Sequence, residues 1–155
     1  MTESNALCES FPHTEKLSAT DKKHRWEEYH QESVRRTRVW APYIEELTRA
    51  KVLQVTGETY KQEFFAGDQR GVWFVTPRKW VWWILHYHVG LDVAWTVIGE
   101  RYNRHRTSVM YTTSTFDMQM RKGHWRDDAS AIQEICDQLS QIGLPDFNVY
   151  DHLAE

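Results

Sequence analysis

The sequence predicts an all-α fold, a small helical domain built around a helix-turn-helix, and three observations support this prediction. Apolar residues recur at the i, i+3 and i+7 spacing of one helical face, as in Trp95, Ile98 and Tyr102. Proline and glycine stand where helices would begin and end, with Pro77 before one apolar run and Gly143 after another. The 155 residues are 41% apolar and 26% charged, which is typical of a globular chain with one core.

The N-terminal part divides into a polar segment and a leading helix. Residues 1–20 are polar and lack periodicity, which predicts disorder. Residues 21–41 favour a helix with Trp26 and Trp40 on a weakly apolar face. Three arginines of this helix could touch DNA backbone or a protein, although a solvated face balanced by glutamates is at least as well supported. They are Arg35, Arg36 and Arg38.

Residues 42–122 are predicted to form the central domain. Its opening helix would begin at Pro42, which suits a first helical turn, and would end at Thr56 and Gly57. Five of the eight tryptophans lie between Trp73 and Trp95, so we expect the core in that neighbourhood.

The helix-turn-helix is predicted within this domain. Its first helix would begin after Pro77 and run to about His88, and its second would span residues 92–102. The third would begin near Arg104, with an inner stripe formed by Val109, Thr112 or Thr113, and Phe116. This stripe leaves four residues on the free N-terminal turn, where a recognition helix presents side chains to base edges. They are His105, Arg106, Thr107 and Ser108.

These residues carry a resemblance to a known family. Pro77-Arg78, Ile98-Gly99 and the run from Arg104 to Val109 are similar to motifs of the C-terminal DNA-binding domain of the bacterial replication initiator DnaA. The resemblance covers about residues 42–119, roughly half of the chain. It implies that the domain binds double-stranded DNA and that Arg70 enters the minor groove; a solvated loop arginine is the alternative. His105-Arg106 replaces the aspartate-histidine pair with which the family contacts bases, so we expect a different target sequence.

Charge is distributed unevenly along the chain. The formal net charge is −3, but residues 70–126 carry nine Lys or Arg against three acids. Residues 127–155 carry seven acids and neither Lys nor Arg. A local basic block is what phosphate binding requires, because phosphates respond to the nearby field more than to the total charge.

Individual roles follow from residue type. Arg106 suits bidentate contacts to guanine, and Thr107 and Ser108 can exchange hydrogen bonds with bases. The predicted phosphate contacts are Arg78, Lys79, Arg101, Arg104 and Lys122. Together with Arg70 and His105, these residues form the predicted DNA-binding surface.

The segment after the helix-turn-helix is acidic. Residues 123–143 predict an amphipathic helix, and residues 144–155 an acidic tail. We expect this helix to pack back onto the domain, or else to form a homodimer through its 128–142 face. Trp80, Trp82 and Trp83 cannot all point inward on one helix, so a patch at residues 80–83 is expected for the leading helix or for a protein partner.

These observations favour a sequence-specific double-stranded DNA-binding protein, a bacterial or phage regulator of transcription or replication. The alternative is a protein-binding module of the same fold that engages or blocks another replication or transcription protein. No GxxxxGK[ST] motif and no informative nucleophile-base pair is present in this sequence, so we expect neither an enzyme nor a cofactor. Cys8 and Cys136 suggest neither a disulfide nor a metal site. We expect a cytoplasmic, nucleoid-associated protein with no membrane segment.

Overall fold

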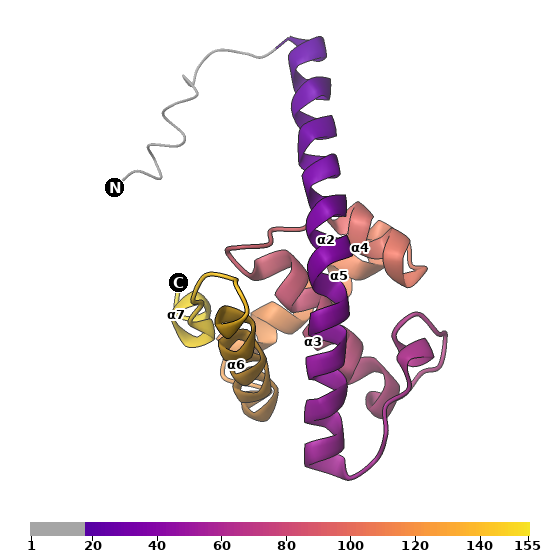
Figure 1. The fold of residues 1–155 in the computed structure, drawn as a ribbon, viewed down its shortest axis with the longest axis vertical. Coiled ribbons are helices and arrows are strands. Elements are labelled where there is room, and N and C mark those ends of the chain that lie inside the picture. The colour runs from indigo at the N-terminus through magenta and orange to yellow at the C-terminus, as the bar shows by residue number, and fades with distance from the viewer. Residues whose placement is uncertain (1–17) are drawn as a thin grey trace. The chain divides into compact units, whose positions relative to one another are not determined.

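The computed structural model describes residues 18–155, and every regular element in this part of the chain is a helix, which confirms the predicted all-α class (Figure 1). The α-helices are α2 (Ala19–Thr56), α3 (Val72–Tyr87), α4 (Trp95–Tyr102), α5 (Arg106–Arg121), α6 (Arg126–Gln141) and α7 (Val149–Leu153). A 3-10 helix, η2 (Gln62–Phe65), precedes α3. The disorder predicted for residues 1–20, and Cys8 with it, falls mostly outside the described residues, and α2 has already begun at Ala19.

The chain divides into two units, residues 1–31 and residues 32–155. In the first unit, the early turns of α2 carry Trp26, whose ring contacts those of Tyr29 and His30 and remains 46% exposed. All elements from η2 to α7 belong to the second unit, together with the rest of α2. The candidate site lies in this second unit.

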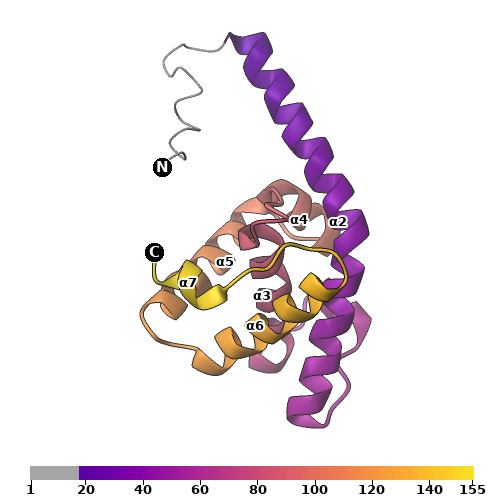
Figure 2. The same ribbon diagram turned by 60° about the vertical axis from the view of Figure 1, so that its left-hand side comes forward.

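Helix α3 supplies the centre of the core in the second unit, with α4, α5, α6 and η2 packed against it (Figure 2). Trp83, Ile84 and Leu85 are completely buried. Trp80 and Trp82 are also buried, at 8% and 4% exposed, so all three tryptophans of residues 80–83 are largely covered within the chain, although the sequence predicts that they cannot all point inward. A helix surrounded by neighbours on most sides can bury side chains all round.

Pro42 does not begin a helix, contrary to prediction. It lies within α2, which continues without a break from the predicted leading helix into the predicted opening helix. A proline inside a helix removes one backbone hydrogen bond, at a cost of about 3 kcal/mol. Here Pro42 is exposed, while buried residues at helical spacing continue on both sides of it and hold the helix together. They are Ser33, Thr37, Ala41, Ile44, Thr48 and Val52.

Pro77 likewise lies inside α3 rather than at its start. The helix begins five residues earlier at Val72, directly after Gly71, whose φ of 108° suits glycine. The added turn is held by Tyr60, which donates a hydrogen bond to the Phe74 carbonyl and packs edge-on against Trp73. Tertiary contacts therefore extend this helix beyond the point that local sequence predicts.

The second predicted helix is shorter than expected. It begins at Trp95 instead of residue 92, because Asp92 has a left-handed φ of 48° and the buried Ala94, which precedes the helix, is extended. The Val93 amide donates to the Leu85 carbonyl at 2.9 Å, and the Ala94 amide donates to the Ser33 hydroxyl at 3.0 Å. These hydrogen bonds fix how the chain enters α4.

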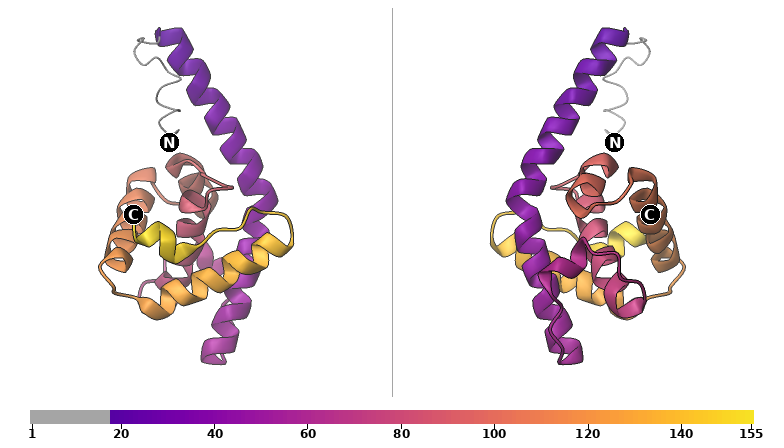
Figure 3. Two further views of the ribbon diagram at one scale, coloured as in Figure 1. Left: turned by 90° about the vertical axis from the view of Figure 1, so that its left-hand side faces the viewer. Right: turned by 90° about the vertical axis from the view of Figure 1, so that its right-hand side faces the viewer.

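The acidic helix α6 packs onto the domain (Figure 3). Ile132, Ile135, Cys136 and Leu139 are all at most 1% exposed. Most of the apolar face of residues 128–142 is therefore covered within one chain, and Ile142 at its end stays 51% exposed, so little of this face is left for the dimer that was the alternative. Packing back onto the domain is confirmed.

The predicted acidic tail is also part of the fold. Leu144 and Val149 are buried, and α7 places His152 beside Asp117 of α5, with 3.1 Å between His152 Nε2 and Asp117 Oδ1. Gln133 of α6 accepts the Val149 amide at 2.7 Å. None of the helices described between residues 18 and 155 is both long and apolar enough to cross a membrane.

Candidate nucleic-acid interface

Helices α4 and α5 form a tight helix-turn-helix. Asn103 ends α4 in the left-handed conformation, with φ of 57°. A Cβ atom at Gly99 would stand 2.5 Å from the Arg104 carbonyl oxygen and 3.3 Å from the Arg106 amide nitrogen. Any side chain at Gly99 would therefore push the two helices apart, which confirms the predicted close approach.

The N-terminal turn of α5 is exposed, as predicted. Arg106, Thr107 and Ser108 all lie at the surface, and within residues 18–155 the Arg106 side chain has no hydrogen-bond or ionic partner. His105 is the N-cap, and its Nδ1 accepts the Thr107 amide at 3.1 Å. His105 therefore orients the turn through one ring nitrogen, which leaves Arg106 as the free cation of this turn.

Inside the same helix, the predicted stripe is correct. Val109, Thr113 and Phe116 are buried, so Thr113 rather than Thr112 occupies the inner position. Further along, Asp117 accepts hydrogen bonds from Trp83 Nε1 at 2.9 Å and from Arg121 Nε at 2.8 Å. Burial alone would raise the pKa of the Asp117 carboxyl, but hydrogen bonds from His152, Arg121 and Trp83 outweigh burial and lower it. This charged anchor fixes α5 on α3.

Arg104 joins the turn to the loop that carries Arg70. Its guanidinium donates to the carbonyls of Ala66 and Gly67 from one side of the loop, and to the Tyr102 carbonyl within the turn. Burial and the nearby Arg78 lower the pKa of Arg104. Because its donors are used inside the chain, Arg104 positions the loop against α5 instead of facing phosphates as predicted.

Arg78 was predicted to contact phosphate, and the structure contradicts this. It is 4% exposed, and its guanidinium donates to the Phe64 carbonyl at 2.7 Å and to the Gln69 carbonyl at 2.9 Å. The Gln69 carbonyl lies in the loop, and the Phe64 carbonyl lies in η2, where it also accepts the Tyr60 hydroxyl at 3.4 Å. Arg78 and Arg104 thus hold the two ends of the same loop, at residues 66–71.

Arg101, which the sequence also predicts to contact phosphate, is instead paired within the fold. Its guanidinium lies on the carboxylate of Glu45 in α2, at 3.0 Å for Nε and 3.1 Å for Nη2. Glu45 is 3% exposed and also accepts hydrogen bonds from the Tyr102 hydroxyl and from Gln62. The charge of Arg101 therefore neutralises a buried acid, so this residue is unsuited to binding phosphate.

Three predicted residues remain available at the surface. Arg70 and Lys122 are exposed, and neither side chain has a hydrogen-bond or ionic partner among residues 18–155. Lys79 is half-buried, with its ammonium over the rings of Phe116 and Trp125 at 5.6 and 5.8 Å from their centroids. The predicted set thus reduces to Arg70, Arg106 and Lys122 as free cations, with Lys79 partly engaged.

Two residues that the sequence did not suggest extend this surface. Met110 and Tyr111 lie one turn after Arg106 and Thr107, and they are 43% and 71% exposed. The spacing of Val109 and Thr113 on the inner side could have identified them, because it places positions 110 and 111 on the outer side of the helix. The sequence also did not indicate Glu45, because its partners Arg101 and Tyr102 are more than fifty residues away.

The remaining chemistry around the site is limited. Among residues 18–155, no group of three or more His, Cys, Asp or Glu is placed to hold a metal ion. His86 stacks on Trp95 at 3.5 Å between ring centroids, and its Nδ1 lies 2.9 Å from the Val93 carbonyl oxygen.

No family model, curated protein or solved structure gives a significant match to this chain.

Proposed function

We propose that the chain is a sequence-specific double-stranded DNA-binding protein whose helix-turn-helix resembles that of the DnaA DNA-binding domain. In this proposal it acts as a bacterial or phage regulator of transcription or replication. The observation that supports the proposal is that two arginines with internal hydrogen bonds, one buried and one half-buried, connect two exposed arginines. Arg104 and Arg78 hold the loop of Arg70 against the turn of Arg106.

This arrangement suits a duplex for a geometric reason. A recognition helix enters the major groove with its N-terminal residues foremost, and an arginine on an adjacent loop can reach the neighbouring minor groove. Arg106 and Thr107 would contact base edges, with Met110 and Tyr111 beside them, while Arg70 would enter the minor groove. Lys122 and Lys79 would hold the phosphate backbone.

The experiment is selection of bound sequences from a random duplex pool, followed by titration of the selected duplex and a random duplex. Arg106→Ala should weaken binding to the selected duplex by about 1 to 3 kcal/mol and binding to random duplex much less. Lys122→Ala is the matched control, because loss of a phosphate contact should weaken both duplexes equally. Failure to enrich any duplex sequence would overturn the proposal.

A second selection arm addresses the family resemblance. Because His105-Arg106 stands where DnaA proteins carry aspartate-histidine, the chain should bind a duplex containing the standard DnaA box more weakly than its own selected duplex. Equal affinity for the two would mean that this replacement does not alter base recognition.

A further inference from the structure

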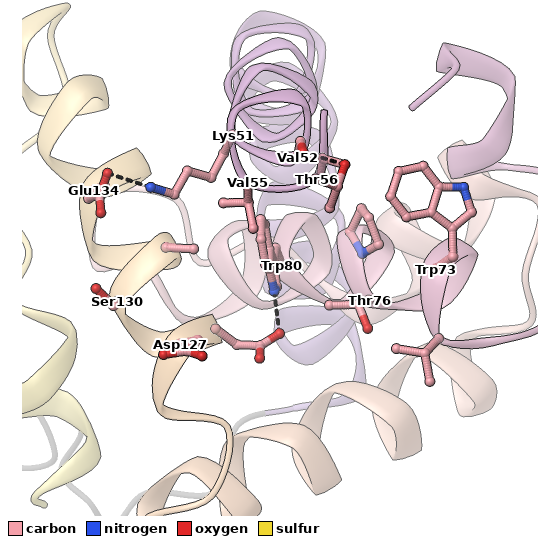
Figure 4. Close-up of a pocket in the computed structure, with 14 residues that line it drawn as sticks. Lys51, Val52, Val55, Thr56, Trp73, Thr76, Trp80, Asp127, Ser130 and Glu134 are labelled. Atoms are coloured by element: carbon pink, nitrogen blue, oxygen red, sulfur yellow. Dashed lines mark hydrogen bonds and ion pairs between the residues drawn. The ribbon is translucent and has the colours of Figure 1, made fainter. Parts of the chain in front are cut away.

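A groove of about 450 Å³ lies between the end of α2, the start of α3 and the start of α6, all within the second unit (Figure 4). Its apolar lining consists mainly of Val52, Val55, Val72, Pro77, Trp80 and Ala131. The volume is within the range of sites that bind a ligand or a few side chains of a partner. None of the predicted DNA-binding residues lines it.

The apolar rims of the groove are unusually open to water. Val55 of α2 is 65% exposed and Val72 of α3 is 76% exposed, whereas Trp80 between them is buried. A small molecule that entered the groove would leave these rims in water. An occupant that covers both valines has to extend from α2 to α3, as a peptide segment does.

The polar side of the groove is acidic. Lys51 is the one cation in its lining, and its Nζ is already paired with Glu134 at 2.8 Å (Figure 4). Asp127 is exposed and Asp128 is half-buried, and both lie in the first turn of α6. The lining therefore has an excess of two negative charges beside an apolar surface.

Asp128 is held in place by the groove itself. Its Oδ2 accepts a hydrogen bond from Trp80 Nε1 at 2.7 Å. Burial raises the pKa of the Asp128 carboxyl, although this hydrogen bond and Lys79 oppose the rise. A cation brought to this carboxylate would compensate for the hydration that the carboxylate has lost.

We infer that the groove binds a segment of a partner protein in which a large apolar side chain stands within one helical turn of a lysine or arginine. The apolar side chain lies on Val55 and Trp80, and the cation faces Asp127 and Asp128. Charge disfavours the chain's own ends as occupants. Residues 1–17 carry three glutamates and one lysine, and residues 127–155 carry seven acids and neither Lys nor Arg. This inference is independent of the proposed DNA binding.

The test is selection from a displayed library of random sixteen-residue peptides against the full chain, followed by titration of synthetic winners. We expect peptides that combine Leu, Ile, Phe or Trp with a nearby Lys or Arg. Val55→Asp should weaken their binding at least tenfold. Val89→Asp is the matched control, because Val89 is 66% exposed and lies outside the groove, and it should change binding less than twofold.

A charge reversal tests the acidic side separately. Asp127→Lys should weaken the same peptides at least threefold, and Asp146→Lys, also at the surface but outside the groove, should not. Peptides without basic residues, no selected peptide at all, or binding that survives Val55→Asp would each overturn the inference. Self-association in sedimentation that Val55→Asp abolishes would also overturn it, because a second copy would then occupy the groove. Unchanged duplex binding by Val55→Asp separates these outcomes from the proposed function.

Discussion

The buried carboxylate of Glu45 accepts the hydroxyl hydrogen of Tyr102, fifty-seven positions further along the chain. The same carboxylate binds the guanidinium of Arg101, so one acid on α2 holds two consecutive residues at the end of α4. Burial and the charge of Glu45 raise the pKa of Tyr102 well above its usual value. The helix-turn-helix is thereby anchored to α2.

Removing this acid should destabilise the fold. Glu45→Ala leaves the Tyr102 hydroxyl buried without its acceptor and Arg101 without its counter-ion, and we expect a loss of about 3 kcal/mol in free energy of unfolding. Urea denaturation measures it. Glu46→Ala is the control, because the Glu46 side chain is 72% exposed and its pairing with Arg49 should contribute less than about 0.5 kcal/mol. Equal losses for both variants would contradict the anchoring role.

Substitution of Arg78 should lower the stability of the fold, whereas substitution of Arg106 should leave it nearly unchanged. Arg78→Ala removes the donor of the Gln69 carbonyl and leaves the Phe64 carbonyl with only the long hydrogen bond from Tyr60, so it should lower the free energy of unfolding by about 1 to 3 kcal/mol. Arg106→Ala should change it by less than about 0.5 kcal/mol, because the side chain is exposed and makes no contact that holds the fold. Denaturation and duplex titration of both variants check this. An Arg78→Ala protein of full stability would reopen its phosphate-binding role.

The affinity for duplex DNA should depend on salt less steeply than it would if all nine Lys and Arg of residues 70–126 contacted phosphates. With Arg78, Arg101 and Arg104 engaged internally, Lys122 and Lys79 remain for phosphates, and Arg70 and Arg106 add their charges close to the phosphates from the two grooves. The slope of log K against log salt should therefore be about −3, at roughly 0.9 per phosphate contact. Fluorescence anisotropy between about 50 and 200 mM salt measures it. A slope steeper than about −5 would mean that the internal arginines are released on DNA.

Thymine methyl groups should contribute to specificity through Tyr111 and Met110. Replacing single thymines of the selected duplex by deoxyuridine removes only the methyl group, which an exposed apolar side chain on a recognition helix can contact. We expect one or two positions at which this replacement costs about 0.8 kcal/mol, or about fourfold in affinity. Tyr111→Ala should abolish the difference at one of them. If every position tolerates deoxyuridine, these side chains do not contact bases.

Acid should destabilise the protein through His88. Burial lowers the pKa of His88 to about 4, and its Nε2 has no hydrogen-bond partner among the described residues. An unfolded histidine titrates near 6.5, so between these values the unfolded chain binds a proton that the folded chain does not. The free energy of unfolding should fall by about 2 to 3 kcal/mol between pH 7.5 and pH 4.5.

The control for this pH dependence is His88→Asn. The asparagine oxygen can accept the Gly90 amide in place of His88 Nδ1, which now accepts it at 2.9 Å, but it cannot take up a proton. Denaturation midpoints of the variant should therefore vary less with pH over this range. An unchanged acid response would assign the effect to other groups, His86 first, since burial lowers its pKa as well.

Local patterns predicted the helical stripes well. Val109 and Phe116 are buried as their spacing indicated, and Gly99 stands where a Cβ atom would collide with the backbone at the start of α5. Such features depend on residues a few positions apart, so the sequence contains the information directly. The exposed turn at Arg106 follows from the same spacing.

Features that depend on distant partners could not be predicted in this way. Arg101 looked like a phosphate contact because its partner Glu45 lies on another helix. Pro42 looked like a helix start because the stripe that carries α2 through it is stabilised by packing rather than by local propensity. Both errors arose where tertiary contacts override a local preference.

The link from Arg104 to Gly67 has a consequence for the length of the DNA site. The loop and the helix-turn-helix are joined by these hydrogen bonds, so the backbone at Arg70 and at Arg106 can separate only if the hydrogen bonds of Arg104 break. On a duplex, this link would fix the number of base pairs between the contact of Arg70 in a narrow minor groove and the contact of Arg106 in the adjoining major groove. Inserting a single base pair between the two contacts would then weaken binding more than changing a base within either one.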